Sequence, residues 1–347
     1  MTSPVNRQIV LAARPAGWPR ESDFKLEEGP IPEPRPGQFL VRNIYMSVDP
    51  YMRGRMNDRR SYAPPFRIGQ PLDGRAVGQV VKSSNPRFPE GECVSSMHGW
   101  REYFLSDGEG VNRIDPGLAP LSVYLGVLGI PGFTGWYGLR EIGRPKPGET
   151  LVVSGAAGAT GSLVAQMGKI LGCRVVGTAG SGAKCAHLTK ELGLDAAIDY
   201  KAAGDLYEAL REACPKGIDI YFENVGGPIL DAVLRLLNPF SRIPLCGMIS
   251  QYNLETPEPG PRYLMSMIGN RTLMQGFIIS DHLDRYPEFV REVGGWLKAG
   301  RLRYEETIVE GLENAPKAFL GLFRGENVGK MLVKVGPDPK PAENNAS

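Results

Sequence analysis

Three glycines at intervals of three are the residues whose type and spacing most clearly predict chemistry. Gly155, Gly158 and Gly161 follow a short apolar run at 151–153, and an amphipathic segment begins directly after them. Small residues let the backbone approach a pyrophosphate, and a helix N-terminus offers N–H groups with a partial positive charge. This pattern predicts the phosphate-binding turn of a dinucleotide fold. It departs from the standard G-x-G-x-x-G, so a plain strand–helix packing turn is the alternative.

The residues after this turn indicate which dinucleotide is bound. An NAD-preferring fold places a carboxylate at the end of the second strand, about 20 residues beyond the glycines. From Cys173 to Lys184 there is no Asp or Glu, and Gly180, Ser181 and Lys184 stand there instead. Backbone N–H groups, a hydroxyl and an ammonium complement a 2′-phosphate. We therefore predict NADPH as the cofactor, against the alternative of an ordinary solvated helix start.

Cysteine and histidine do not form a metal-binding pattern. The five cysteines and three histidines are scattered, with no C-x-x-C pair. A structural zinc usually needs closely spaced cysteines, and a catalytic zinc needs a convergent set of Cys, His or carboxylate ligands. We therefore expect a zinc-free chain with reduced thiols.

The composition argues against several classes of protein. The 347 residues carry 40 Lys and Arg against 38 Asp and Glu. This balance predicts no nucleic-acid partner. No run of 18 apolar residues occurs, so no membrane span is expected. The first seven residues lack the apolar core of a signal peptide, which predicts a cytoplasmic protein.

The elements that must position these residues fall into two regions. Residues 1–122 have strand composition, interrupted by a proline-dense connector at 29–37, and predict a small antiparallel barrel. From residue 123 strands and helices alternate, which predicts an α/β fold with a parallel sheet. The strands expected there are 151–153, 174–178, 196–200, 218–222, 243–247 and 273–279, and the helices are 162–171, 183–192, 206–213, 229–237 and 287–299.

The C-terminal segment is expected to return to the first region. Residues 330–335 have strand composition, and the polar, proline-bearing tail from about 336 is expected to be disordered. The predicted domains are therefore 1–122, 123–290 and a returning segment at 291–347.

Several separated stretches resemble one family of oxidoreductases. They are residues 47–53, 129–134, 155–161, 198–201, 222–227, 246–253 and 325–330. The sequence is similar to the zinc-independent medium-chain dehydrogenases/reductases that include leukotriene B4 dehydrogenase/prostaglandin reductase, plant double-bond reductases and curcumin reductase. The resemblance implies a GroES-like catalytic domain, a Rossmann NADPH-binding domain and a homodimer. It also implies reduction of a C=C bond conjugated to a carbonyl, in α,β-unsaturated ketones and aldehydes.

The resemblance also implies the residues of a cofactor site. Lys184 and Tyr200 would hold the 2′-phosphate, the 155–161 turn the pyrophosphate, and Asn224 and Asn327 the nicotinamide half. The complete expected set is Pro50, Gly155, Ala156, Ala157, Gly158, Ala159, Thr160, Gly161, Gly180, Ser181, Lys184, Tyr200, Asn224, Cys246, Tyr252, Phe277, Ile278, Ile279 and Asn327.

The resemblance implies that Tyr252 and Tyr51 face the substrate, and these two are the expected catalytic residues. Hydride addition to the β-carbon of an enone leaves negative charge on the carbonyl oxygen, and a phenol aimed at that oxygen can donate to it. Tyr252 follows a strand end, where open α/β sheets bind ligands. A buried structural tyrosine is the alternative for Tyr252, and a turn with an inward-packed ring is the alternative for Tyr51. A zinc-free quinone reductase and a non-catalytic NADPH-binding protein also remain open.

Overall fold

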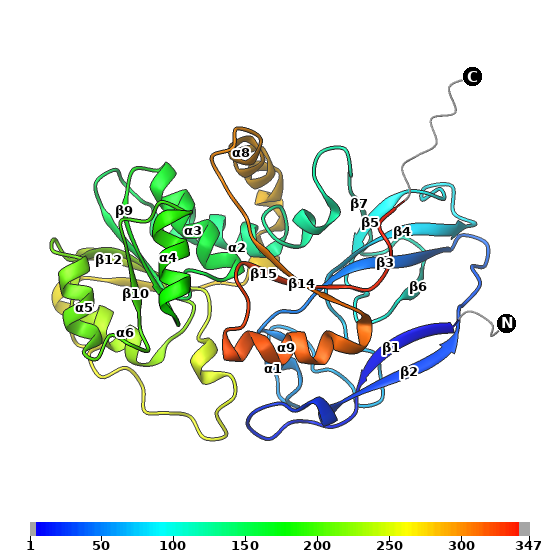
Figure 1. Ribbon diagram of the computed structural model, residues 1–347, viewed down its shortest axis with the longest axis horizontal. Helices are drawn as coiled ribbons and strands as arrows, with labels where there is room; N and C mark the ends of the chain where they lie inside the picture. Colours follow the sequence, from blue (N-terminus) through cyan, green and yellow to red (C-terminus); the bar gives the residue numbers. More distant parts are fainter. Residues whose placement is uncertain (1–4, 340–347) are drawn as a thin grey trace. The chain divides into compact units, whose positions relative to one another are not determined.

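The computed structural model describes residues 5–339 (Figure 1). The chain forms two compact units, each discontinuous in sequence. Unit 1 comprises the chain up to Leu125, then Thr307–Glu326 and the chain from Met331, and unit 2 comprises Gly126–Glu306 and Asn327–Lys330. Within residues 5–339, no helix has the length and apolar character needed to cross a membrane.

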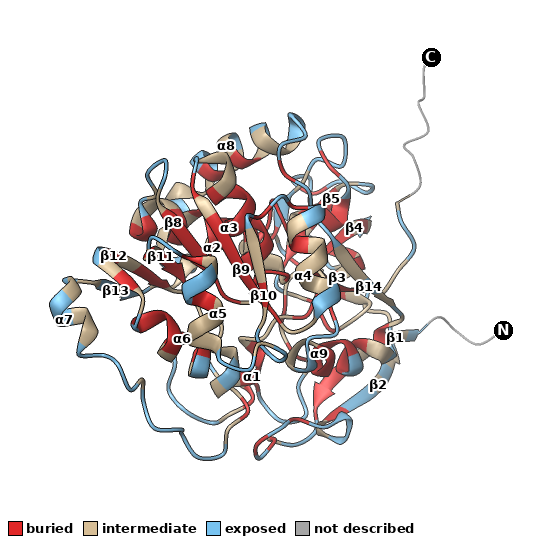
Figure 2. Cartoon of the chain, turned by 60° about the vertical axis from the view of Figure 1, so that its left-hand side comes forward, coloured by how far each residue is buried: buried red, intermediate tan, exposed pale blue. Residues whose placement is uncertain are grey.

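Unit 2 is built on a six-stranded sheet in the order β10-β9-β8-β11-β12-β13, and its strand pairs are parallel. Continuous apolar runs at β8, β9 and β11 explain why these strands are almost wholly buried (Figure 2). The strands are β8 (Thr150–Val153), β9 (Arg174–Ala179), β10 (Ala196–Asp199), β11 (Ile218–Phe222), β12 (Leu237–Leu245) and β13 (Leu273–Gly276), and the helices are α2 (Ile130–Tyr137), α3 (Ala159–Ile170), α4 (Gly182–Lys190), α5 (Leu206–Ala213), α6 (Gly227–Leu234), α7 (Ser266–Asn270) and α8 (Tyr286–Lys298).

The predicted parallel sheet of an α/β fold is confirmed, with differences at the element ends. The helix predicted at 229–237 ends at Leu234, and the strand predicted at 243–247 begins six residues earlier, at Leu237. Leu237 pairs with Ile218 before the register shifts, so sheet pairing outweighs the helical pattern at this point. The strand predicted at 273–279 ends at Gly276.

Unit 1 contains a seven-stranded sheet in the order β14-β15-β3-β4-β5-β7, with β6 paired to β3. A separate antiparallel ribbon joins β1 to β2. The C-terminal strand β15 pairs antiparallel with β3, Leu332 opposite Ser47. The elements are β1 (Val5–Leu11), β2 (Phe24–Pro30), β3 (Phe39–Ser47), α1 (Met52–Arg55), β4 (Ala76–Ser83), β5 (Cys93–Ser96), β6 (Tyr103–Ser106), β7 (Asn112–Arg113), β14 (Glu306–Glu310), α9 (Ala315–Arg324) and β15 (Lys330–Lys334).

Helix α9 packs its apolar face on the core of unit 1. Phe319 lies edge-on to both Phe24 and Trp100, which stack on each other with ring centroids 5.7 Å apart. The sequence pattern predicts neither α9 nor β2, and the first residues of the predicted proline-dense connector belong to β2. Of the predicted disordered tail, residues 340–347 lie outside the described residues.

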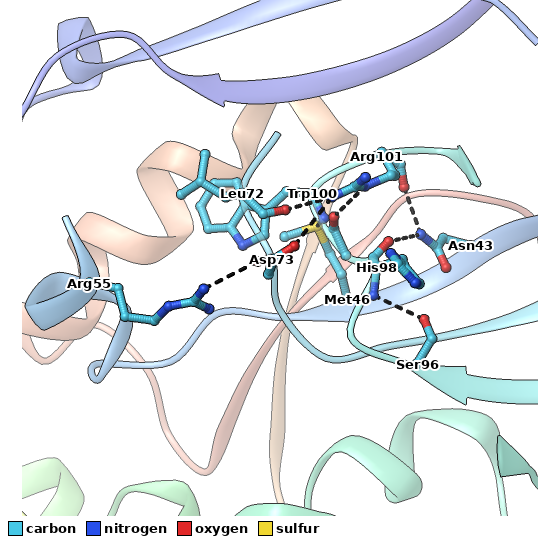
Figure 3. A network of polar contacts seen from close by, with 10 residues as sticks. Asn43, Met46, Arg55, Leu72, Asp73, Ser96, His98, Trp100 and Arg101 are labelled. Carbon is cyan, nitrogen blue, oxygen red and sulfur yellow. Dashed lines mark hydrogen bonds and ion pairs between the residues drawn. The ribbon is translucent and has the colours of Figure 1, made fainter. Parts of the chain in front are cut away.

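A network of polar contacts lies in unit 1 next to Trp100 (Figure 3). The Asp73 carboxylate pairs with Arg55 at 3.2 Å and with Arg101 at 3.7 Å. The buried Asn43 amide donates to the carbonyls of His98 and Arg101, both at 2.8 Å. The network therefore ties β3 to the segment that joins β5 to β6.

Candidate functional site

The glycine turn after β8 has the close packing that its sequence predicts. Gly155 has φ +59°, a left-handed conformation that favours glycine. A Cβ on Gly161 would lie 2.3 Å from the Gly155 carbonyl oxygen. Gly158 precedes the first residue of α3 in an extended conformation. The Ala156 N–H donates to Thr178 at 3.0 Å, which anchors the turn to β9. The turn thus presents a helix N-terminus from a crowded, side-chain-poor backbone.

A short segment from the far end of the chain completes this turn. Gly329 pairs with Gly158 and donates its N–H to the Ala157 carbonyl at 2.8 Å. Asn327, which is 9% exposed, donates from Nδ2 to the Gly329 carbonyl at 2.7 Å. The structure therefore brings Asn327 together with the 155–161 turn, although about 170 residues separate them in the sequence.

Asn224 lies beside the same turn, at the carboxyl end of β11. Its Nδ2 donates to the Ser154 carbonyl at 2.7 Å, and its N–H donates to Ser154 Oγ at 2.8 Å. A Cβ on Gly155 would lie 3.5 Å from Val225 Cγ2 and 3.8 Å from Asn224 Cβ. Asn224 is thus fixed against the first glycine.

The loop from Cys246 to Tyr252 packs on the Asn224 turn. The carbonyls of Asn224 and Val225 accept hydrogen bonds from Ile249 and Ser250 at 3.1 and 3.0 Å. A Cβ on Gly247 would lie 3.0 Å from the Tyr252 hydroxyl. Tyr252, Asn224 and the glycine turn therefore meet at the carboxyl edge of the unit 2 sheet, where open α/β sheets bind ligands.

The Tyr252 hydroxyl oxygen accepts one hydrogen bond from the protein, and the hydroxyl keeps its own proton. It accepts the Met248 N–H at 3.3 Å. Burial raises the pKa of Tyr252 above its ordinary value of 10, the Met248 N–H partly offsets this, and Cys246 and Glu223 raise it further. Burial likewise raises the pKa of the Cys246 thiol to about 12. Tyr252 is therefore a neutral proton donor, and Cys246 is a neutral thiol.

A second group of expected residues gathers at the start of α4. Ser181 caps the helix by accepting the Lys184 N–H at 3.3 Å. Burial, followed by the charge of Lys201, lowers the pKa of Lys184. A Cβ on Gly180 would lie 3.0 Å from the Tyr200 hydroxyl and 3.3 Å from Lys201 Cε. Because Gly180 has no side chain, space remains between the N-terminus of α4, Lys184 and Lys201. This arrangement fits a phosphate dianion.

Phe277 directly follows β13, which lies at the opposite end of the six-stranded sheet from β10. A Cβ on Gly138 would lie 2.8 Å from both Phe277 and Phe222, so Phe277 packs on the helical segment after α2. Its ring centroid is 5.7 Å from that of Tyr137. Ile278 and Ile279 follow it as half-buried residues.

Pro50 and Tyr51 belong to unit 1. Tyr51 is half-buried and packs against the apolar core that contains Met52 and Phe66. Burial, with a further contribution from Asp49, raises the pKa of Tyr51 well above 10. Tyr51 thus packs partly against this core, and its role at the substrate stays a prediction.

Two residues at the sheet edge were not expected from the sequence. Glu223 and Ser154 are fully buried and joined by a 2.8 Å hydrogen bond, although they are 69 residues apart. The available signal was an acid and a hydroxyl directly after two largely apolar strands. Within residues 5–339, no group of three or more His, Cys, Asp or Glu side chains is arranged to hold a metal ion.

The fold and the glycine turn define a class of protein, an oxidoreductase built from a GroES-like β-rich domain and a Rossmann-type domain. Two family models match, "N-terminal domain of oxidoreductase" over residues 7–114 and "Zinc-binding dehydrogenase" over residues 159–294. The chain belongs to the zinc-independent medium-chain dehydrogenase/reductase family that includes curcumin, 2-alkenal and prostaglandin reductases.

Relatives at high identity span nearly the whole chain. The chain is 48% identical to the NADPH-dependent curcumin reductase of Escherichia coli, covering 96% of this chain and 98% of the relative. It is 44% identical to the NADP(+)-dependent 2-alkenal reductase of Nicotiana tabacum, covering 95% and 97%. A crystal structure of CurA from Vibrio vulnificus in complex with NADPH matches with TM-score 0.92 and 48% identity, covering 96% and 100%.

Proposed function

We propose that this protein is an NADPH-dependent reductase of the C=C bond in α,β-unsaturated ketones and aldehydes. The supporting observation is the convergence of the glycine turn, Asn224, Asn327 and Tyr252 at one sheet edge. Relatives that act on such carbonyl compounds are 44–48% identical over almost all of the chain. The acid-free space at Gly180 and Lys184 favours NADPH over NADH.

NADPH, when bound, supplies the hydride for the β-carbon, and the residues of this chain provide position and charge. The 155–161 turn would hold the pyrophosphate. Gly180, Ser181, Lys184 and Tyr200 would hold the 2′-phosphate. The remaining cofactor contacts would come from Pro50, Asn224, Cys246, Tyr252, Phe277, Ile278, Ile279 and Asn327.

Tyr252 would donate a hydrogen bond to the carbonyl oxygen as negative charge develops there. Its hydroxyl accepts the Met248 N–H, so its own proton is available for a substrate oxygen. A raised pKa keeps that proton in place at neutral pH. The α-carbon is then protonated by solvent. Tyr51 would contact the substrate from unit 1, as the resemblance implies.

A substrate panel tests this function. NADPH consumption is followed by absorbance with an enone, an enal and a quinone as acceptors, each also assayed with NADH. We expect turnover of the enone and the enal, with NADPH preferred. Quinone reduction alone would indicate a quinone reductase, and tight NADPH binding without turnover would indicate a non-catalytic binding protein.

We also propose a division of labour between the domains and a cytoplasmic homodimer. Residues 123–290 would bind NADPH, residues 1–122 would supply the substrate side, and 291–347 would return to the catalytic domain.

The proposed dimer interface lies at the edge of the unit 2 sheet. Strand β13 ends the six-stranded sheet. Four apolar side chains near it are exposed, namely Leu264 (47%), Met265 (80%), Ile268 (77%) and Leu273 (40%). An open edge beside exposed apolar residues favours association with a second copy.

A further inference from the structure

Glu223 is a completely buried carboxylate at the carboxyl end of β11. Its Oε1 accepts three hydrogen bonds, from Ser154 Oγ at 2.8 Å, Val225 N at 2.7 Å and Gly226 N at 3.0 Å. Its Oε2 is buried without a hydrogen-bond partner among the described residues. Burying a charge that is only partly satisfied costs free energy. Packing alone therefore does not account for a carboxylate at this position.

Hydrogen bonds extend from Glu223 to Asn224 through Ser154. The Ser154 hydroxyl donates to Glu223, and the same oxygen accepts the Asn224 N–H at 2.8 Å. The Ser154 carbonyl then accepts the Asn224 side-chain amide at 2.7 Å. Hydrogen bonds to an ionised acceptor are about twice as strong as neutral ones. The charge of Glu223 thus strengthens the hydrogen bond that the Ser154 hydroxyl accepts from the Asn224 main-chain N–H, and this bond holds Asn224 in place beside the glycine turn.

The main chain of Glu223 holds the second segment of the site. Its carbonyl accepts hydrogen bonds from Cys246 N at 2.9 Å and Gly247 N at 3.1 Å. Gly247 lies directly against the Tyr252 hydroxyl. A displacement of the turn at Glu223 would therefore move the loop that carries Tyr252.

We propose that Glu223 is a positioning residue for the reduction, whose charge holds the main chain of Asn224 through the Ser154 hydroxyl and whose own main chain holds the Cys246–Tyr252 loop. This inference rests on the proposed function. Glu223 acts on the cofactor and substrate only through these neighbours.

The test is Glu223→Gln, which preserves the shape of the side chain and an acceptor oxygen but removes the charge. NADPH binding is measured without substrate, by titrating the quenching of protein fluorescence. We expect the Kd for NADPH to rise about tenfold, with a fall of similar size in kcat/KM. A Kd and a kcat/KM both within twofold of the unchanged protein would overturn the inference.

Asp219→Asn is the matched control on the same strand. Asp219 lies at the other end of β11, where its carboxylate accepts the Thr150 N–H and the Asn238 amide at 2.8 Å each. This variant loses a hydrogen-bonded charge far along the strand from the site. We expect it to lower the Tm and to leave the Kd for NADPH within twofold. An equal rise in Kd for Asp219→Asn and Glu223→Gln would indicate a general loss of sheet stability and contradict the positioning role.

A double-mutant cycle with Ser154→Ala tests the route of the effect. If Glu223 acts through Ser154, the double variant binds NADPH no more than twofold less tightly than the weaker single variant. Additive losses contradict that route. Should Glu223→Gln fail to fold, Ser154→Ala alone carries the test, with an unchanged Kd overturning the inference. Failure of the unsubstituted protein to bind NADPH would instead contradict the proposed function.

Discussion

At the scale of single residues, the candidate site depends on a few oriented polar groups. Tyr252 is the clearest case, because the Met248 N–H fixes its hydroxyl as an acceptor and burial raises its pKa. Lys184 is a second oriented group. Burial and the charge of Lys201 lower the pKa of its ammonium, and its backbone N–H donates to the Ser181 hydroxyl. A like charge next to a half-buried ammonium is unfavourable, and a bound anion would relieve it.

Tyr252→Phe should lower kcat/KM for an enone at least tenfold, about 1.4 kcal/mol of transition-state stabilisation. The hydroxyl is the group that would donate to the developing oxyanion, and phenylalanine preserves the ring packing. Steady-state kinetics measure the effect, and the Kd for NADPH serves as the control and should change less than threefold. A fall in kcat/KM of less than threefold would remove Tyr252 from the mechanism.

Lys184→Ala should raise the KM for NADPH about tenfold while leaving the KM for NADH within twofold. Only NADPH carries the 2′-phosphate that the ammonium would neutralise, and a tenfold change corresponds to about 1.4 kcal/mol. Both constants are measured with the same enone. Lys190→Ala, a change of an exposed lysine at the end of α4, is the control. A loss of equal size for both cofactors would contradict the assignment.

The sequence predicted those site residues that belong to local motifs. The glycine turn and the span from Gly180 to Lys184 are continuous in sequence, so spacing alone reveals them. Ser154 and Glu223 could not be found in this way, because they meet only where β8 pairs with β11. Sequence patterns do not specify which strands become neighbours.

At the scale of elements, the predicted boundaries are correct where the local sequence, and not pairing with another element, determines where the element ends. Helix α5 and strand β11 begin and end at the predicted residues. The boundary between α6 and β12 failed, since pairing of Leu237 with Ile218 ends the helix early. Strand β2 was missed because its alternating charged residues face solvent on a two-stranded ribbon.

The segment joining β5 to β6 should make unfolding depend on pH. The ring of His98 stacks on Phe104, with centroids 4.6 Å apart. Burial, and then the charge of Arg101, lower the pKa of His98 below 6.5, while Asp73 opposes this. As pH falls through 6.5 the unfolded chain takes up a proton before the folded chain does. The free energy of unfolding should therefore decrease from pH 6.5 down to the folded pKa.

His98→Phe keeps an aromatic ring against Phe104 and removes the titrating group. We expect a smaller loss of stability between pH 7.5 and pH 5 than in the unsubstituted protein. Urea denaturation midpoints at the two pH values measure the difference. Equal losses in both proteins would show that His98 does not contribute to this dependence.

At the scale of the whole molecule, the two units share one chain but have separate cores. Trp100, Phe24 and Phe319 lie in the core of unit 1. Val152, Tyr221 and Ile243 lie in the core of unit 2. The proposed homodimer concerns unit 2, because Leu264, Met265, Ile268 and Leu273 are exposed in and just before α7 and in β13.

Met265→Asp combined with Ile268→Asp should convert the proposed dimer to monomer. Two new carboxylates at an interface formed by exposed apolar residues would be buried without partners, which is costly. Size-exclusion chromatography with light scattering measures the mass. Leu118→Asp, on an exposed residue of unit 1, should leave the mass unchanged. A dimer that persists in the double variant would place the interface elsewhere.

The discontinuity of unit 1 has a consequence for biosynthesis. The chain from Gly126 to Glu306 supplies nearly all of unit 2 as one stretch, so this unit can fold while the ribosome is still adding the remaining residues. The sheet of unit 1 cannot be completed until later, because β3 pairs with β15 only after residues 332–334 have emerged from the ribosome. The first part of the chain to be made is therefore the last to be completed. A premature stop before residue 330 would release a protein whose N-terminal sheet retains an exposed strand edge, which favours aggregation.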